Sequence, residues 1–158
     1  MNLLGNPVAV MFLSFLLGML GNALLRRLAI YKSFGDRYLF TGAKPYENLG
    51  VLWYRRFLLA TPFKWFNTSI RFSANRSLEK FDVVLGHMID AEVAHWIGFA
   101  GMLVFSIAAF WYRGFEMASA HLILNLLGNL YPCLLQQYNR QRLNRVINSV
   151  KRRSDNSA

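Results

Sequence analysis

The sequence predicts an all-α integral membrane helical bundle with about three transmembrane helices and an interfacial amphipathic segment. Charged residues make up only 16% of its 158 residues, whereas soluble domains average about 25%. Three long runs carry no formal charge, and each approaches the roughly 20 residues that a helix needs to cross a bilayer. The length suits a single membrane domain over residues 1–158.

The first predicted span covers residues 7–25, in a stretch from Asn2 to Leu25 that has no charged side chain. A cleavable signal peptide is the competing interpretation, but such peptides usually begin with basic residues and end at a small-residue cleavage site. Here the first basic residues are Arg26 and Arg27, and no convincing cleavage site precedes them. We therefore expect a retained anchor.

The second and third predicted spans cover residues 93–112 and 117–136. Only four residues separate these runs, which predicts a tight antiparallel hairpin. Between Ser77 and Ala94, apolar residues recur at steps of three and four, the spacing of one helical face. We expect that helix to continue directly into the second span.

The basic residues are unevenly distributed among the connections. Eleven of the eighteen Lys and Arg residues lie between Arg26 and Asp90, six lie in the tail from Arg140, and one lies in the hairpin turn. Cytoplasmic connections of membrane proteins are enriched in Lys and Arg. We therefore expect a multi-pass protein of the cell inner (cytoplasmic) membrane with its N-terminus outside and its C-terminus in the cytoplasm. Residues 26–92 form the cytoplasmic or interfacial segment, and residues 140–158 form a basic cytoplasmic tail.

Charge and cysteine content narrow the class further. A net charge of +10 would by itself suit nucleic acid, but the basic residues flank apolar runs, as they do beside anionic lipid headgroups, and no nucleic-acid-binding motif is present. We expect a membrane and no nucleic acid as partner. The single cysteine, Cys133, excludes an intrachain disulfide and is expected to pack as a small apolar residue. No metal is expected, because the three histidines do not form a recognisable ligand set.

An aromatic and basic segment lies between the first two spans. From Tyr46 to Trp65 it mixes aromatic, apolar and basic residues, as segments at a membrane interface do. A solvated basic linker is the plainer interpretation, but the density of aromatic residues argues against it. We expect a broken amphipathic helix in the interface, or a segment that dips partway into the membrane before Pro62, with Trp53 and Arg56 contributing to substrate binding. Its aromatic residues include Trp53, Tyr54, Phe57, Phe63, Trp65 and Phe66.

Glu92 and His95 form the first candidate group for chemistry. Side chains three residues apart on a helix can meet, and a carboxylate beside an imidazole fixes its tautomer and makes it a better base. The pair lies where an aqueous segment enters the membrane, so a capping or snorkelling pair at the span boundary is an equal alternative. Ionisable residues embedded in membranes are nevertheless functional candidates by default.

The third run carries a polar stripe although it has no formal charge. Its members step by three or four residues and therefore share one helical face. Polar groups in hydrocarbon need partners, so the stripe marks a bundle interior, a cavity or a site. Asn125 and Asn129 are candidate substrate-binding residues, although packing against other spans is the more common use of such residues. His121 is expected to be structural. The stripe consists of His121, Asn125, Asn129, Pro132, Gln136 and Asn139.

The last predicted helix runs into a basic block. Arg140 and Arg142 suit a phosphate or carboxylate, because guanidinium groups form bidentate pairs with both. A positive-inside anchor, which needs only charge, is the alternative. Gln136, Tyr138 and Asn139 join the two arginines as candidate substrate-binding residues.

Three sets of residues carry a family resemblance. They are Glu47–Gly50 with Trp53 and Phe57; Ala91, Glu92, His95 and Trp96; and Asn129 and Pro132 with the block Gln-x-Tyr-Asn-Arg-x-Arg-Leu from Gln136 and the closing Lys151–Arg153. In this order and at this spacing they resemble the glycosyl-4,4'-diaponeurosporenoate acyltransferases, small membrane enzymes that complete staphyloxanthin-type carotenoids. The resemblance covers roughly residues 34–153. The chain departs from the family pattern at Gln137, where the pattern has Arg.

The resemblance implies transfer of a fatty acyl group to a sugar hydroxyl of a glycosylated carotenoid or lipid. It implies an acyl thioester as co-substrate and no bound cofactor. The hydroxyl proton needs a base, which His95 oriented by Glu92 is expected to provide. Asn129 or Gln136 is expected to donate hydrogen bonds to the oxyanion. The arginines of the basic block are expected to meet a phosphate-bearing acyl carrier, with Arg55 and Arg56 as alternatives.

Two other functions stay open on sequence alone. A lipid-modifying methyltransferase or reductase would also place Asn, Pro and Arg on a late helix, beside a cytoplasmic cofactor. A non-enzymatic assembly or accessory subunit would use the polar stripe to pack against a partner. Three spans make a thin bundle, so a homodimer is also among the expected arrangements.

Overall fold

The computed structural model describes residues 3–61 and 78–156. Within these ranges the chain is helical and contains no strand. The predicted all-α class is therefore confirmed. The chain divides into two compact units, and both α4 and α6 contribute residues to each of them. Unit 1 comprises Met1–Arg37 and Asp90–Cys133, and unit 2 comprises Tyr38–Ile89 and Leu134–Ala158.

Three helical stretches of the described chain are long and apolar enough to cross a membrane. They are Pro7–Leu25, Phe81–Arg113 and Phe115–Arg152. All three predicted spans fall inside these stretches, so the expectation of about three membrane-length helices is confirmed. The second and third helices extend well beyond the predicted spans, because the helical structure continues into the polar residues that follow or precede each apolar run.

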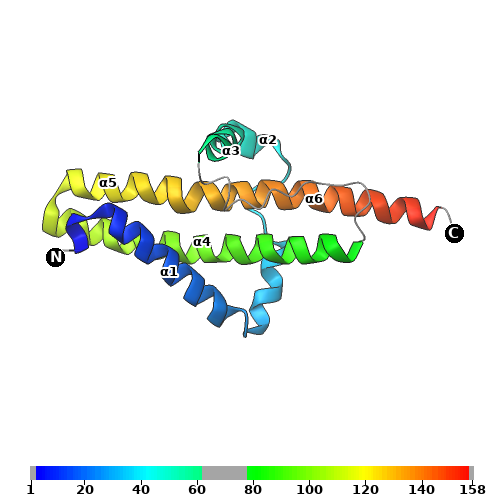
Figure 1. Ribbon diagram of the computed structural model, residues 1–158, viewed down its shortest axis with the longest axis horizontal. Coiled ribbons are helices and arrows are strands. Elements are labelled where there is room, and N and C mark those ends of the chain that lie inside the picture. The colour runs from blue at the N-terminus through cyan, green and yellow to red at the C-terminus, as the bar shows by residue number, and fades with distance from the viewer. Residues whose placement is uncertain (1–2, 62–77, 157–158) are drawn as a thin grey trace. The chain divides into compact units, whose positions relative to one another are not determined.

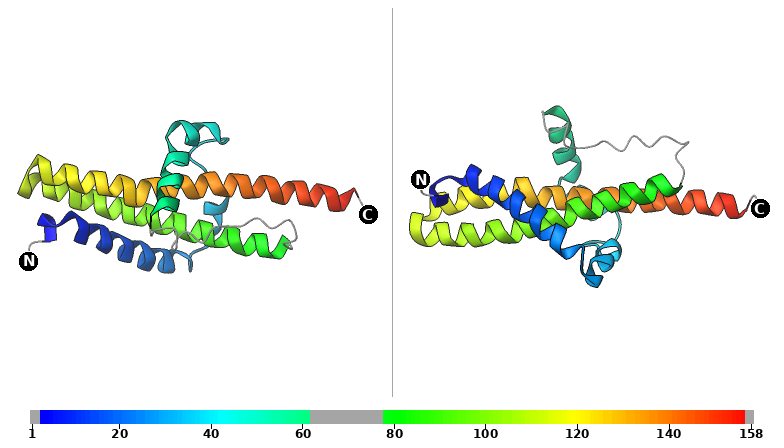
Figure 2. Two further views of the ribbon diagram at one scale, coloured as in Figure 1. Left: turned by 45° about the horizontal axis from the view of Figure 1, so that its top comes forward. Right: turned by 60° about the horizontal axis from the view of Figure 1, so that its bottom comes forward.

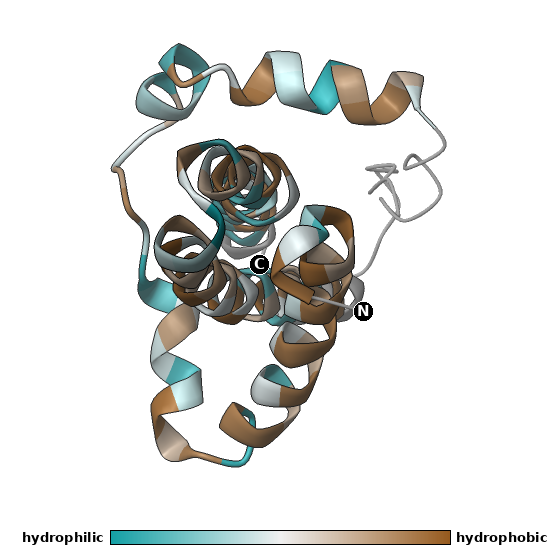
Figure 3. Ribbon diagram, turned by 90° about the vertical axis from the view of Figure 1, so that its left-hand side faces the viewer, coloured by the Kyte–Doolittle hydropathy of each residue, from teal (hydrophilic) through white to brown (hydrophobic). Residues whose placement is uncertain are grey.

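Helix α1 (Pro7–Leu25) follows a short 3₁₀ turn, η1 (Leu3–Gly5). Its start is fixed by Asn6, whose side-chain oxygen accepts a hydrogen bond from the backbone N–H of Ala9 at 3.0 Å, and by a proline in the first turn, where no intrahelical N–H is needed. From the N-terminus onward its ribbon is mainly hydrophobic (Figure 3). Helix η2 (Ala29–Asp36), also 3₁₀, follows it.

Small residues let α1 approach α4 (Leu78–Arg113) closely in unit 1 (Figure 1). A Cβ atom on Gly18 would lie 2.3 Å from the backbone oxygen of Ala94, and one on Gly98 would lie 2.9 Å from that of Ser14. Only glycine therefore fits at either position. Close backbone approach at small residues is a common way for membrane helices to associate, and here it sets the position of α1 against α4.

Helix α4 is continuous over 36 residues, which confirms that the helix expected from Ser77 runs directly into the second predicted span. The expected tight hairpin is also present (Figure 2). Gly114 alone separates α4 from α5 (Phe115–Asn125), and its φ of 89° lies in the region that glycine adopts most easily.

A π-helical turn, η4 (Leu126–Leu130), joins α5 to α6 (Tyr131–Asp155). It lies directly before Pro132, which has no N–H to donate to the carbonyl four residues earlier and whose ring crowds that carbonyl. Widening the turn relieves both problems without ending the helix. The chain therefore continues in one helical direction through the proline.

Unit 2 contains α2 (Lys44–Asn48) and α3 (Val51–Ala60), separated by a left-handed Gly50 with φ of 78°. This agrees with the broken amphipathic helix expected between the first two spans. Of its predicted aromatic residues, Phe63, Trp65 and Phe66 lie outside the described residues. The apolar core of unit 2 joins α4 to α6 and consists of Phe81, Met88, Leu143 and Ile147, with Val84 and Leu85 packed against it.

Candidate functional site

His95 lies in unit 1 with its ring held between α1 and the π-helical turn. Its Nδ1 is 3.5 Å from Oδ1 of Asn129, and the ring of Phe15 meets it edge-on at 5.9 Å. The structure thus places an amide oxygen of Asn129 beside the His95 ring, while the pairing of His95 with Glu92 stays a prediction. The sequence named both Asn129 and His95 as candidates but did not pair them.

A directed chain of hydrogen bonds fixes the orientation of Asn129. The backbone carbonyl of Phe99 can only accept, and it accepts from Nδ2 of Asn125 at 3.0 Å. Oδ1 of Asn125 therefore faces Asn129 and accepts from its Nδ2 at 2.9 Å. The same Nδ2 donates to Oγ of Ser14 at 3.1 Å, while that hydroxyl donates to the carbonyl of Met11. Asn125, Asn129 and Ser14 are fully buried.

This chain of donors and acceptors has a consequence for His95. With both amide hydrogens of Asn129 engaged, its Oδ1 is the atom left to face the imidazole, and Oδ1 can only accept. Nδ1 of His95 must then carry the hydrogen, so that in the neutral ring Nε2 holds the free lone pair. The arrangement suits a base at Nε2. It does not suit Asn129 as a donor to an oxyanion, because its two donor hydrogens already have acceptors.

The absence of a side chain at Gly98 leaves room for the amide of Asn129. A Cβ on Gly98 would lie 2.8 Å from Oδ1 of Asn129. Asn129 itself lies in the π-helical turn, a feature that often marks functional positions in helices. Gly98 and the widened turn together place the amide beside His95.

Glu92 is also buried in unit 1. One turn before His95 on α4, its backbone carbonyl is approached by Sγ of Cys133 at 3.6 Å. Cys133 is fully buried and makes this weak contact as a small packing residue would.

A polar cluster lies near the end of α1. The hydroxyl of Tyr31 donates to the carboxylate of Asp90, and Asp90 forms an ion pair with Arg26 at 3.3 Å. Burial and the neighbouring carboxylate raise the pKa of Tyr31 above its usual range. The cluster connects η2 to the start of the α4 segment that carries Glu92 and His95.

In unit 2, α6 holds the segment of residues 38–47. Oε1 of Gln137 accepts from the hydroxyl of Tyr46 at 2.7 Å and from the backbone N–H of Leu39 at 2.9 Å. The hydroxyl of Tyr138 donates to Glu47 at 3.2 Å. Two sets of residues that carry the family resemblance, around Glu47 and around Tyr138, therefore meet in space.

The two arginines predicted to bind an anion lie in different environments. Arg140 is fully buried, with its guanidinium 4.5 Å from the ring centre of Tyr38. Arg142 is exposed and lies 5.7 Å from the ring centre of Tyr138. Of the two, Arg142 is the one that an approaching soluble anion can reach. Gln136 and Asn139 are half-buried on the same helix.

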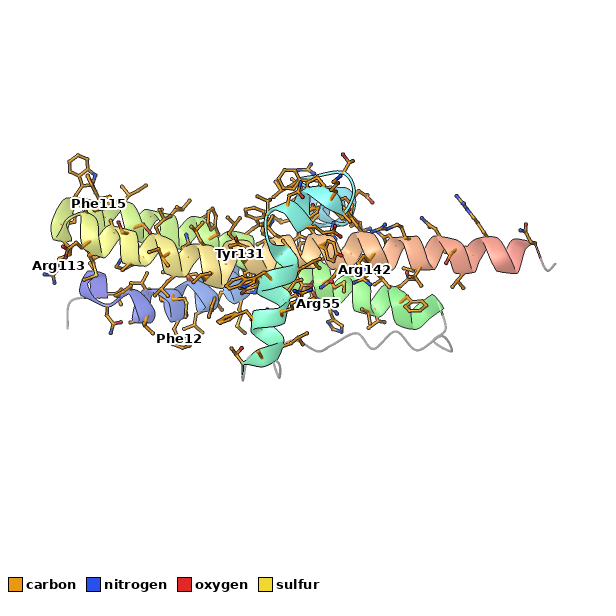
Figure 4. All side chains as sticks on the ribbon, turned by 90° about the horizontal axis from the view of Figure 1, so that it is seen from above. Phe12, Arg55, Arg113, Phe115, Tyr131 and Arg142 are labelled. Atoms are coloured by element: carbon orange, nitrogen blue, oxygen red, sulfur yellow. The ribbon has the colours of Figure 1, made fainter. Side chains whose placement is uncertain are left out.

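Helix α3 presents the remaining two predicted residues at its surface. The rings of Trp53 and Phe57 are stacked, 5.9 Å apart and within 11° of parallel, and Trp53 is 63% exposed. Arg56 is exposed, as is its neighbour Arg55, which Figure 4 labels on this helix. An exposed aromatic pair beside arginines is typical of helices that lie at a membrane interface.

The predicted site residues thus form two sets. Unit 1 contains His95, Glu92, Asn125 and Asn129, and unit 2 contains Trp53, Arg56, Gln136, Tyr138, Asn139, Arg140 and Arg142. Sequence reasoning missed Ser14, Tyr38 and Tyr46 as partners of Asn129, Arg140 and Tyr138. It identified Gln137 as a departure from the family pattern but not as the acceptor for Tyr46. A serine in a long apolar run was the available signal for Ser14.

Comparison with known families gives a match over most of the chain. The model of the family described as CrtO, glycosyl-4,4'-diaponeurosporenoate acyltransferase, matches residues 28–149. The match includes all the predicted site residues. No curated protein and no solved structure matches the chain.

Proposed function

Because the chain belongs to the CrtO family, the glycosyl-4,4'-diaponeurosporenoate acyltransferases, we propose that it moves a fatty acyl group from an acyl thioester to a sugar hydroxyl of a glycosylated carotenoid. The family establishes an acyltransferase of carotenoid biosynthesis. The donor, the acceptor hydroxyl and the residues that act are the subject of the proposal.

In the proposed reaction His95 acts as the general base. Nε2 takes the proton of the sugar hydroxyl as the hydroxyl oxygen attacks the carbonyl carbon of the thioester. The tetrahedral intermediate then collapses, the carbon–sulfur bond breaks, and the proton leaves with the thiolate as a thiol. The products are a glycoside acylated on its sugar hydroxyl and a free thiol, so no oxidant, metal or bound cofactor is required.

The observation that carries this role is the hydrogen-bond chain from Phe99 through Asn125 and Asn129. It supports the Nδ1–H tautomer of His95, with the free lone pair on Nε2. Asn129 is proposed as a positioning residue rather than an oxyanion donor. The expectation that Gln136 donates a hydrogen bond to the oxyanion stays a prediction. Glu92 stays a proposed catalytic partner through its buried carboxylate.

The exposed arginines are proposed to bind the anionic part of the donor. Arg142 on α6 and Arg56 on α3 are both exposed, and guanidinium groups bind phosphate in bidentate fashion. Tyr138 and Asn139 are proposed to line the same substrate-binding surface, and Trp53 to meet the apolar part of a substrate or lipid. Arg140, which is buried against Tyr38, is proposed to shape this surface from beneath.

A partner-binding role for the polar stripe has less support. The amides of Asn125 and Asn129 find acceptors within unit 1, so they do not need a second protein to satisfy them. In a purely structural accessory subunit, the fixed orientation of His95 would in addition have no function. Acyl transfer is therefore preferred over an assembly role.

The test is mass spectrometry of lipids and pigments from the native host. Three strains are compared: with the gene, without it, and with a His95→Ala copy restored. The proposal expects loss of an acylated glycosyl-carotenoid without the gene, accumulation of the unacylated precursor, and no rescue by His95→Ala.

Immunoblotting of membranes confirms that the variant is produced. An unchanged lipid and pigment profile in cells that make the wild-type protein would contradict acyl transfer. Full rescue by His95→Ala would be consistent with acyl transfer but would show that His95 is not its base.

A further inference from the structure

A groove of about 280 Å³ runs between α4 and α5 within unit 1. It lies in the two helices of the hairpin, both of which belong to stretches apolar enough to cross a membrane. Its lining includes Leu103, Ser106 and Phe110 from α4 and Phe115, Ala118 and Ser119 from α5.

The lining of this groove has no charged side chain, and its only polar side chains are Ser106 and Ser119. The hydroxyl of Ser106 donates to the backbone carbonyl of Met102 at 2.9 Å, so its hydrogen is engaged within its own helix. The lining thus offers a charged or strongly polar occupant few partners, which favours an uncharged, apolar one.

The volume and apolar lining of the groove suit part of a single acyl chain. Small side chains, Ser106, Ala118 and Ser119, form part of its lining, and Phe110 and Phe115 lie at the hairpin end; Phe115 is labelled there in Figure 4. A volume of about 280 Å³ lies at the lower limit of ligand pockets.

The groove is in helical register with the candidate base. Ser106 follows His95 by eleven residues on α4, which is close to three turns, so the two share one face of the helix. At 1.5 Å per residue they are separated by about 16 Å along the axis. An extended chain whose reactive end lies at His95 would therefore reach the groove by following α4.

We propose that this groove holds the distal part of the acyl chain of the donor, and that Phe110 and Phe115 limit the length of that chain. The inference rests on the proposed acyl transfer and adds a chain-length selector to it. A flexible, unbranched acyl chain can follow α4 from His95 to the groove, whereas a glycosylated carotenoid has a rigid, methyl-branched body.

The first test fills the groove and measures chain-length preference. Purified protein carrying Ala118→Phe is assayed with decanoyl and stearoyl thioesters of coenzyme A, and Ser119→Phe provides a second variant in case the first does not fold. The ratio of stearoyl to decanoyl turnover is expected to fall about tenfold, which corresponds to losing groove contacts for two methylene groups.

Ile123→Phe is the matched control, because Ile123 lies on the same helix, is 56% exposed and does not line the groove. It is expected to leave the ratio unchanged. An unchanged ratio in both groove variants, or an equal loss with both thioesters, would overturn the groove as a chain subsite.

The second test does not depend on turnover. Stearoyl coenzyme A with a diazirine near the end of its chain is photolysed with the full-length wild-type protein and with Ala118→Phe. Cross-links within residues 103–122 are expected in the wild type and are expected to be lost in the variant. Their absence from that range in the wild type would overturn the inference. Cross-linking there by a wild-type protein that transfers no acyl group would instead support the groove and contradict the proposed function.

Discussion

At the scale of single residues, the orientation of His95 depends on groups with which it shares no contact. The backbone carbonyl of Phe99 orients Asn125, Asn125 orients Asn129, and Asn129 presents an acceptor to the imidazole. Each step follows from which atoms can donate and which can only accept. Buried polar chains of this kind are stable only when every member is satisfied. A change at one member should therefore affect the base at the end of the chain.

Replacing Asn129 with leucine tests this dependence. We expect kcat to fall at least about tenfold with little change in KM, because the ring loses its acceptor while the groups that bind substrate stay in place. Steady-state kinetics of purified protein measure both constants.

His121→Leu is the matched control. His121 is fully buried on α5, and its Nδ1 bonds to the carbonyl of Met117 in its own helix at 2.8 Å, outside the chain that leads to His95. Its Nε2 has no hydrogen-bonding partner among the described residues, so leucine removes an unsatisfied atom. Equal losses of kcat in the two variants would show a general packing defect and contradict the positioning role.

At the scale of elements, each unit depends on one characteristic contact between its helices or segments. In unit 1, glycines allow the backbones of α1 and α4 to approach, and this approach also brings Ser14 to Asn129. In unit 2, polar side chains of α6 hold the segment of residues 38–47. The first contact depends on the absence of side chains and the second on particular acceptor atoms. They should therefore fail under different substitutions.

Gly18→Ala should weaken the contact between α1 and α4. The added methyl group would lie 2.3 Å from the carbonyl oxygen of Ala94, so the helices must separate, at a cost of about 1–3 kcal/mol. Thermal unfolding in detergent is expected to show a lower Tm. Gly101→Ala is the control, because its methyl group would lie 3.5 Å from the nearest atom, a side-chain methyl of Leu17. A Tm that stays the same in Gly18→Ala would contradict the close approach.

Gln137→Leu should loosen the segment of residues 38–47 from α6. Leucine cannot accept from the hydroxyl of Tyr46 or the N–H of Leu39, which both lose this acceptor. We expect chymotrypsin to cleave the segment at least several-fold faster than in the wild type. Asn148→Leu, at an exposed position on the same helix, should leave the cleavage rate unchanged. Protection equal to the wild type in Gln137→Leu would show that this acceptor does not hold the segment.

The elements were predicted unequally well from the sequence, for physical reasons. Membrane-length helices impose a length and composition on the chain that can be read directly, so α1, α4 and the hairpin at Gly114 were expected. The pairing of Gln137 with Tyr46 joins residues that are far apart in the sequence and leaves no periodic pattern. The same holds for Ser14 with Asn129. The sequence identified His95 and Asn129 as separate candidates, and only the packing of the helices shows that they are partners.

At the scale of the whole molecule, the distribution of Lys and Arg predicts an orientation in the membrane. The hairpin turn is expected outside and the basic tail in the cytoplasm. In a Cys133→Ala background, a membrane-impermeant maleimide should label Glu116→Cys in intact cells. It should label Asn148→Cys only after the cells are permeabilised. The opposite labelling pattern would invert the predicted topology and place the basic tail on the other side from a cytoplasmic acyl donor.

The proposed mechanism joins the activity of the family, acyl transfer in carotenoid biosynthesis, to a base at His95. Its most direct test is acyl transfer by the purified protein in lipid vesicles, supplied with a radiolabelled acyl thioester and a glycosylated carotenoid. We predict that the wild-type protein forms a labelled, acylated glycosyl-carotenoid. His95→Ala should lower the rate of transfer at least about a hundredfold, the range expected for removing a general base. Transfer at the wild-type rate by His95→Ala, in a protein of unchanged thermal stability, would contradict the role of His95 as the base.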